Sequence, residues 1–166
     1  MYMRKLAILY YIKEYYIINM ISPQQKYLNE DKDRQFGLNK EKTQMNIIID
    51  TLGTYNLKKL EDRYAIFDYH DIEENVYVEL KTRRNTMNAY PTTMIGYNKI
   101  IEGIKLIRSR KSHVYFFFDF TDCLTYFELT EDNYERIFFA RGGRNDRGFI
   151  EQSAYAYIPI KDLIKV

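Results

Sequence analysis

Two charged residues, Glu79 and Lys81, interrupt the apolar part of the stretch "YVELKTRR" at residues 77 to 84. Side chains alternate between the two faces of a strand, so Glu79 and Lys81 point the same way. A third charged residue, Asp68, lies within another run rich in apolar residues, "RYAIFDYHD". Two carboxylates on neighbouring strands repel each other and are stable as a pair mainly when a hard cation lies between them. With a lysine that orients or deprotonates a bound water, such a site has the parts for phosphodiester hydrolysis.

The plain alternative is a salt bridge between Glu79 and Lys81 with no chemical role. A Glu-x-Lys triplet carries little weight by itself, because "EDK" at Glu30 to Lys32 also matches and lies in a polar stretch. The hypothesis therefore depends on the elements that surround the triplet.

The surrounding pattern predicts an α/β protein with a mixed central β-sheet flanked by helices and extra C-terminal strands. The segment 37–53 is a helix with an apolar stripe, an N-cap at Asn39 and a terminating glycine at Gly53. Its residue Glu41 falls on the inward stripe. Helix 92–111 and the apolar strand 113–120 follow a predicted hairpin. The predicted strands are 63–71, 75–83, 113–120, 123–129, 136–140 and 154–160, and "RGGRNDRG" at 141–148 is predicted as a loop.

The order of these elements and the residues Asp68 and Glu79-Leu80-Lys81 resemble the PD-(D/E)XK nuclease superfamily, which has the restriction-endonuclease-like fold. The core of that fold is a helix, a three-stranded meander, a helix and a further strand. Residues 37 to 128 match this αβββαβ order. Many members also carry an acid on the first helix that faces the site, and Glu41 occupies the matching place.

The resemblance implies a role for each matching residue. Asp68 and Glu79 would bind Mg²⁺, for which Mn²⁺ would substitute, and the Leu80 backbone carbonyl would be a further ligand. Lys81 would position or activate the water, and Glu41 would support the same metal or a second one. Phe67 stands where the family often has a proline, which leaves Asp71 as a rival to Asp68; we prefer Asp68 because it lies within the predicted strand.

Basic residues near these elements are candidates for contact with nucleic acid, although the net charge of the chain is only +2. Each has an ordinary alternative as a solvated or salt-bridged surface residue. The candidates are Arg83, Arg84, Lys99, Arg141, Arg144 and Arg147.

Length and composition limit the remaining choices. With 166 residues, 46% of them hydrophobic, the chain fits one domain, which we place at 37–166 after an N-terminal helix and polar linker at 1–36. Met20 is an alternative start. A single cysteine and two histidines exclude a disulfide framework and a cysteine-rich zinc site. The first 21 residues are too interrupted by charge to span a membrane, and we expect an intracellular protein, in the cytoplasm, nucleus or nucleoid.

The sequence thus predicts a small Mg²⁺-dependent nuclease that hydrolyses phosphodiester bonds, with DNA favoured over RNA as the substrate. Both an endonuclease and an exonuclease fit the pattern. A homodimer would let two sites cut two strands, and nothing in the sequence requires one. The alternatives are an inactive nucleic-acid-binding module of the same fold and a structural or interaction protein.

Overall fold

A computed structural model describes residues 43–62, 64–144 and 151–166. The chain divides into two compact units, one of residues 37–141 with 154–166 and the other of residues 1–36 with 142–153. The first unit contains nearly all of the described residues, Asp68 and Glu79 among them. Glu41 and Arg147 lie outside the described residues, and so does the predicted N-terminal helix.

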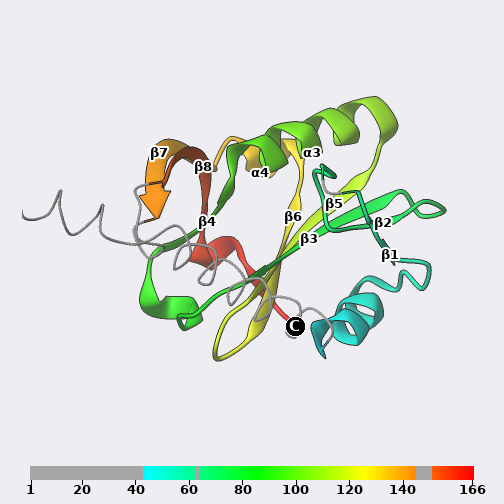
Figure 1. Cartoon of the computed structure of the whole chain (residues 1–166), viewed down its shortest axis with the longest axis horizontal. Coiled ribbons are helices and arrows are strands. Elements are labelled where there is room, and N and C mark those ends of the chain that lie inside the picture. Colours follow the sequence, from blue (N-terminus) through cyan, green and yellow to red (C-terminus); the bar gives the residue numbers. More distant parts are fainter. Residues whose placement is uncertain (1–42, 63, 145–150) are drawn as a thin grey trace, which may run out of the picture. The chain divides into compact units, whose positions relative to one another are not determined.

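The first unit is built on a six-stranded mixed sheet with the order β1-β2-β3-β5-β6-β9 (Figure 1). Strands β1, β2 and β3 form an antiparallel meander, and β5 pairs parallel to β3. Strands β6 and β9 then continue antiparallel. The bounds are Lys58–Lys59 for β1, Tyr69–Asp71 for β2, Val76–Thr82 for β3, His113–Asp119 for β5, Leu124–Leu129 for β6 and Ile164–Lys165 for β9.

Helix α3, Tyr97–Arg110, makes the crossover between the parallel strands β3 and β5. Its residues Ile100 and Ile104 belong to the larger core cluster, together with Phe116 of β5. The other face of the sheet carries a second cluster, which contains Val78 of β3 and Ile48 of the helical segment 43–52. The predicted αβββαβ order is therefore confirmed, with one helix on each face of the sheet.

The predicted helix end at Gly53 is also confirmed. Residues 43–52 are helical, and Gly53 follows with a φ of +66° and an amide that donates to the Ile49 carbonyl oxygen at 2.8 Å. A positive φ is a conformation that glycine adopts without a steric cost.

A three-stranded sheet with the order β4-β8-β7 corrects the predicted start of the second helix. Residues 92–96 form strand β4, Thr92–Gly96, and the helix begins only at Tyr97. β4 pairs antiparallel with β8, Glu151–Pro159, so the β-branched residues Thr92, Thr93 and Ile95 take part in a ladder.

Two further boundaries differ from the predictions. The strand predicted at 63–71 is limited to β2, so Asp68 directly precedes the strand instead of lying within it. The loop predicted at 141–148 is wrong for its first four residues, which belong to β7, Phe138–Arg144. Short elements complete the unit: η1 at Met87–Ala89, α4 at Glu131–Tyr134 and η2 at Ile160–Asp162. Within the described ranges, no helix has the length and apolar character needed to cross a membrane.

Substitution of Gly53 tests its role in ending the first helix. Nothing lies within 4 Å of a Cβ built at this glycine, so a loss of stability would come from the backbone conformation alone. We expect Gly53→Ala to lower the free energy of unfolding by about 1–2 kcal/mol and Gly53→Asn to lower it less. Urea unfolding followed by circular dichroism measures both, and an unchanged midpoint for the alanine variant would contradict the assignment.

Candidate active site

The carboxylate of Glu79 is the most deeply buried charged group in the described part of the chain, with an exposed fraction of 0%. It lies between two lysines: Oε1 is 2.6 Å from Lys81 Nζ, and Oε2 accepts a hydrogen bond from Lys99 Nζ at 2.8 Å. Lys99 also donates to the backbone carbonyl oxygen of Ile66. A buried carboxylate is costly unless it is paired, and these two cations offset its charge.

Asp68 lies beside Glu79 on the neighbouring chain segment. Its amide donates to the Val78 carbonyl oxygen at 3.1 Å, and its Oδ2 accepts a hydrogen bond from the Leu80 amide at 2.9 Å. The β2–β3 register pairs Tyr69 with Val78, and Asp68 and Glu79 are the next residues outward from that pair. The structure therefore brings Asp68 and Glu79 together, as the sequence predicts.

The pKa values of the site follow from burial and from these charges. Burial raises the pKa of Glu79, and Asp68 adds to the rise, whereas Lys81 and Lys99 oppose it. Burial acts to lower the pKa of Lys81, but attraction to Glu79 and Asp68 outweighs it, so the pKa of Lys81 is raised overall. Lys81 is consequently a cation at neutral pH in the metal-free protein.

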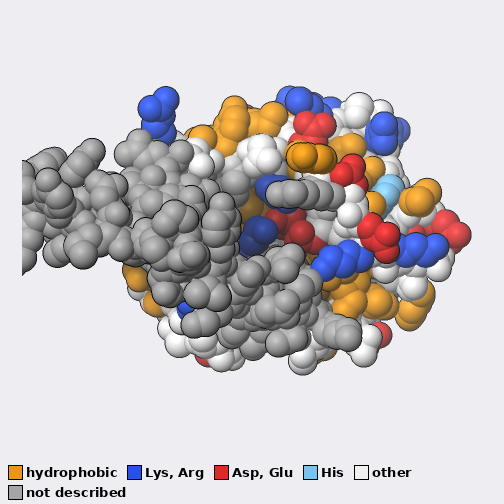
Figure 2. All heavy atoms as spheres, viewed as in Figure 1, with side chains coloured by type: hydrophobic (Ala, Val, Ile, Leu, Met, Phe, Trp, Pro, Cys, Tyr) orange, Lys and Arg blue, Asp and Glu red, His pale blue; other side chains and the backbone are white. Residues whose placement is uncertain are grey.

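Strand β3 and helix α3 position the site. Alternation along β3 directs Val78 and Leu80 into the cluster shared with Ile48, and it directs Glu79 toward α3, where Lys99 lies in the first turn. Figure 2, which has the same view as Figure 1, shows acidic and basic side chains close together near the middle of β3. Lys81 is 38% exposed in its side chain, so the site reaches solvent at this lysine.

Lys99 contacts a different partner from the one that the sequence predicts. The sequence suggests that it reaches the nucleic-acid backbone, and the structure instead places it on Glu79. The sequence signal that could have revealed this is Gly103, four residues later, which is buried against Leu129 and Val114 on the face that packs against the sheet. Residues at i and i+4 share one helix face, so Lys99 falls at the edge of the inward stripe.

Asp71 is held by a different set of contacts. Its carboxylate is 1% exposed and accepts hydrogen bonds from the amides of Asn56, Glu73 and Glu74 at 3.0–3.2 Å. This pattern fastens the turn between β2 and β3 to the segment that follows the first helix. The geometry thus gives Asp71 a structural task and leaves Asp68 beside Glu79.

The arginines predicted to contact nucleic acid differ in how far they are exposed. Arg83 is half-buried: its guanidinium donates to Thr93 Oγ1 at 3.2 Å and to the Met94 carbonyl oxygen, and it stacks on the Phe118 ring. Arg84 and Arg141 are exposed. Arg144 lies in β7, but its side chain is outside what the structure describes, as are Arg147 and Glu41.

The oxygen donors of this site suit a hard cation such as Mg²⁺, which prefers carboxylate ligands. Glu79 Oε1 is buried and accepts no well-aligned hydrogen bond from the described residues, so it has ligand capacity beyond its contact with Lys81. Asp68 and Glu79 would hold the ion, with the Leu80 carbonyl as the further predicted ligand. Among the described residues, no group of three or more His, Cys, Asp or Glu side chains is clustered for metal binding. The pair thus needs a backbone, water or additional acidic ligand.

A comparison with protein families agrees with this geometry. The family described as "Phage putative PDDEXK endonuclease" matches residues 24–166. The chain therefore belongs to this family, within the PD-(D/E)XK class that its fold and its Asp68 and Glu79-Leu80-Lys81 residues define. No curated protein matches the sequence.

The contact between Lys99 and Glu79 predicts a coupled loss of stability. In the metal-free protein, Lys99→Met removes one of two cations from a fully buried carboxylate and should cost about 1–3 kcal/mol in unfolding free energy. Glu79→Gln combined with Lys99→Met should cost less than the sum of the single changes, by about 0.5–3 kcal/mol. Chemical denaturation of the four proteins in EDTA measures this coupling.

Lys105→Met is the matched control on the same helix, because Lys105 pairs with Glu102 on the exposed side at 3.0 Å. Exposed pairs contribute about 0–1 kcal/mol. Strict additivity of the Glu79 and Lys99 changes would show that their contact has no energetic weight.

A second pair of substitutions separates Asp68 from Asp71. Asp71→Ala removes the acceptor of three backbone amides and should lower stability by about 1–3 kcal/mol while Mg²⁺ still raises the melting temperature. Asp68→Asn should have the opposite profile, with a small effect on the metal-free protein and no stabilisation by Mg²⁺. Thermal melts with Mg²⁺ and with EDTA distinguish the two, and the reverse pattern would identify Asp71 as the metal ligand.

Proposed function

We propose that this protein is a Mg²⁺-dependent nuclease that hydrolyses phosphodiester bonds in DNA. The observation that supports the proposal most directly is the fully buried Glu79 carboxylate, next to Asp68 and in contact with Lys81. A fold alone does not imply an activity, so the proposal rests on the acidic pair and the lysine of the site. Membership of a family described as endonucleases points the same way.

In this proposal Asp68 and Glu79 bind the metal ion, and the ion supplies Lewis-acid activation of the phosphate and of a water. Lys81 reaches solvent while its ammonium stays beside Glu79, so it can hold a water or a phosphate oxygen against the acidic pair. Because its pKa is raised, its first task is to position the water and to stabilise the charge that develops on the phosphate.

Lys99 has a different task in this proposal. It is largely buried, it contacts Ile66 and Glu79, and its distance to Glu79 Oε2 is fixed by the start of α3. It offsets the charge of Glu79 in the metal-free protein and would hold the carboxylate in its orientation for a metal ion. Lys99 is thus a positioning residue in this proposal, whereas Lys81 contacts the substrate.

One observation favours a second candidate, a non-catalytic module of the same fold. Both oxygens of Glu79 already have lysine partners, which is also the arrangement expected of a purely structural ion pair. A metal ion bound at Oε1 would share this oxygen with the Lys81 contact. Activity measurements on matched variants decide between the two candidates.

The test is cleavage of supercoiled plasmid and of single-stranded DNA with Mg²⁺, Mn²⁺ or EDTA. We expect Mg²⁺-dependent cleavage by the wild-type protein and a rate at least about 100-fold lower for Glu79→Gln and for Lys81→Met. Gel-resolved product formation over time gives the rates.

Lys105→Met, an exposed change on α3, controls for preparation and for loss of a positive charge. Cleavage that survives both site substitutions, or that continues in EDTA, would refute the mechanism. Salt-sensitive binding of DNA without cleavage would favour the non-catalytic module.

A further inference from the structure

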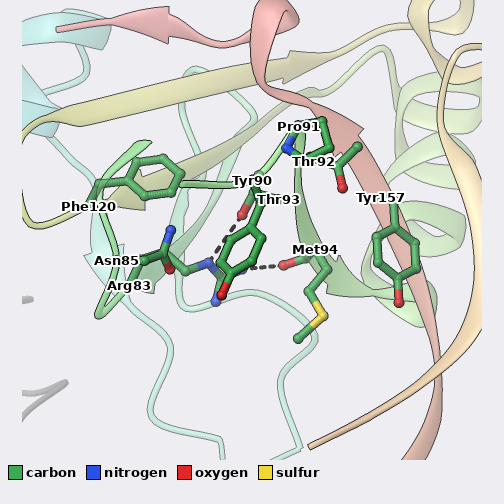
Figure 3. Close-up of a pocket in the computed structure, with 9 residues that line it drawn as sticks. All are labelled: Arg83, Asn85, Tyr90, Pro91, Thr92, Thr93, Met94, Phe120 and Tyr157. Carbon is green, nitrogen blue, oxygen red and sulfur yellow. Dashed lines mark hydrogen bonds between the residues drawn. The ribbon is translucent and has the colours of Figure 1, made fainter. Parts of the chain in front are cut away.

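A pocket of about 420 Å³ lies beside the end of β3, outside the acidic site (Figure 3). Its lining comes from four segments: the residues after β3, strand β4 with the residues before it, the residue after β5, and β8. The lining residues are Arg83, Asn85, Tyr90, Pro91, Thr92, Thr93, Met94, Phe120 and Tyr157. Its size falls within the range of about 300–1,000 Å³ that is typical of pockets for small ligands.

The walls of the pocket are suited to a flat ring. Phe120 is buried and Tyr157 half-buried, and in Figure 3 they lie at its two sides, with Tyr90 between them in the view. Tyr90 exposes 64% of its surface although it is large and aromatic. An exposed aromatic ring on an apolar pocket provides a stacking surface.

Polar groups at the pocket match the edges of a nucleobase. The Asn85 side chain offers its amide oxygen as an acceptor, because its amide nitrogen already donates to the Thr86 carbonyl oxygen at 2.8 Å, and Thr92 contributes a hydroxyl that can donate. Arg83 places a positive charge at the same wall, fixed by its bond to Thr93 and its stacking on Phe118. The pocket thus combines an apolar stacking surface, hydrogen-bonding edges and one cation, which is the combination that a nucleotide requires.

The position of the pocket connects it to the proposed site. Arg83 follows Lys81 by two residues, which is about 7 Å along an extended strand. Its contact with Phe118 places it on the α3 side of the sheet, where Glu79 also lies. Lys81 and the pocket therefore lie on the same side of the sheet, near enough for one nucleic-acid strand to contact both.

We propose that this pocket binds an unpaired nucleobase of the substrate strand, stacked on Tyr90. The inference rests on the proposed function and makes it more specific: the preferred substrate has a single-stranded or frayed nucleotide next to the scissile bond. A fully paired base is stacked within its duplex and cannot enter such a pocket without being extruded.

The binding test uses the full chain in EDTA, where the proposed function predicts no cleavage. Oligonucleotides carry 2-aminopurine, whose fluorescence falls on stacking, either in a single strand or within a blunt duplex. The chain contains no tryptophan, so the signal belongs to the probe. We expect quenching with the single strand and weaker binding of it by Tyr90→Ala, about 5- to 150-fold, which corresponds to one stacked base. Tyr90→Phe should restore binding because the ring is kept.

Tyr55→Ala is the matched control. Tyr55 is 80% exposed and follows Gly53, near the opposite ends of β3 and β5. This variant should bind both probes as the wild type does.

Failure of this inference is distinguishable from failure of the nuclease proposal. Equal binding of the single strand by wild type and Tyr90→Ala, or an unquenched probe, overturns the pocket assignment even if the protein cleaves DNA with Mg²⁺. An unquenched probe is also the result expected if another part of the chain fills the pocket. A wild-type protein that neither binds nor cleaves DNA overturns both proposals.

Discussion

The need to neutralise one buried carboxylate governs the arrangement of this protein. Glu79 lies in the middle of β3 with no exposed surface, and such a group is tolerated only when cations are brought to it. Lys81 comes from the same strand, but Lys99 comes from α3, after the chain has passed through β4. The electrostatic requirement of a single side chain is thus met in part from the first turn of the crossover helix.

The sheet separates this polar requirement from the hydrophobic one. Val78 and Leu80 pack in one cluster with the first helix, and the alternating residues Glu79 and Lys81, on the other face, carry the charges. Strand β5 can run parallel to β3 and be almost wholly apolar because α3 covers it. The acidic pair therefore lies on a rigid frame, and Lys81 is the part of it that reaches solvent.

Much of this arrangement is predictable from sequence because it follows from local patterns. Alternation in β3 indicates the face that Glu79 and Lys81 share, and Gly53 marks a helix end. The errors arise where distant segments decide the outcome. The local pattern of residues 92–96 predicts a helix, but these residues pair with β8 as strand β4. That partner is about sixty residues away in sequence. Lys99 reads as a surface residue for the same reason, because its partner is on another element.

Asp68 illustrates the intermediate case. Its pairing with β3 is predictable from the hairpin, yet the residue lies just before β2 because regular pairing with both neighbours starts at Tyr69. Sequence alone also could not exclude Asp71, whose contact with the Asn56 amide depends on how the turn folds back on that segment. Local patterns thus identify the candidates, and tertiary contacts distinguish their tasks.

The pairing of the last strands has a consequence for how the protein is made. β8 completes the ladder of β4, although β3, α3, β5 and β6 lie between the two strands or before them in sequence. During synthesis β3, α3 and β5 therefore emerge from the ribosome before β8 does. The strand that precedes Lys99 stays unpaired until β8 has emerged, and a nascent chain without β8 would lack the ladder that holds β4 directly before α3. Completion of the native site is in this way coupled to the emergence of β8.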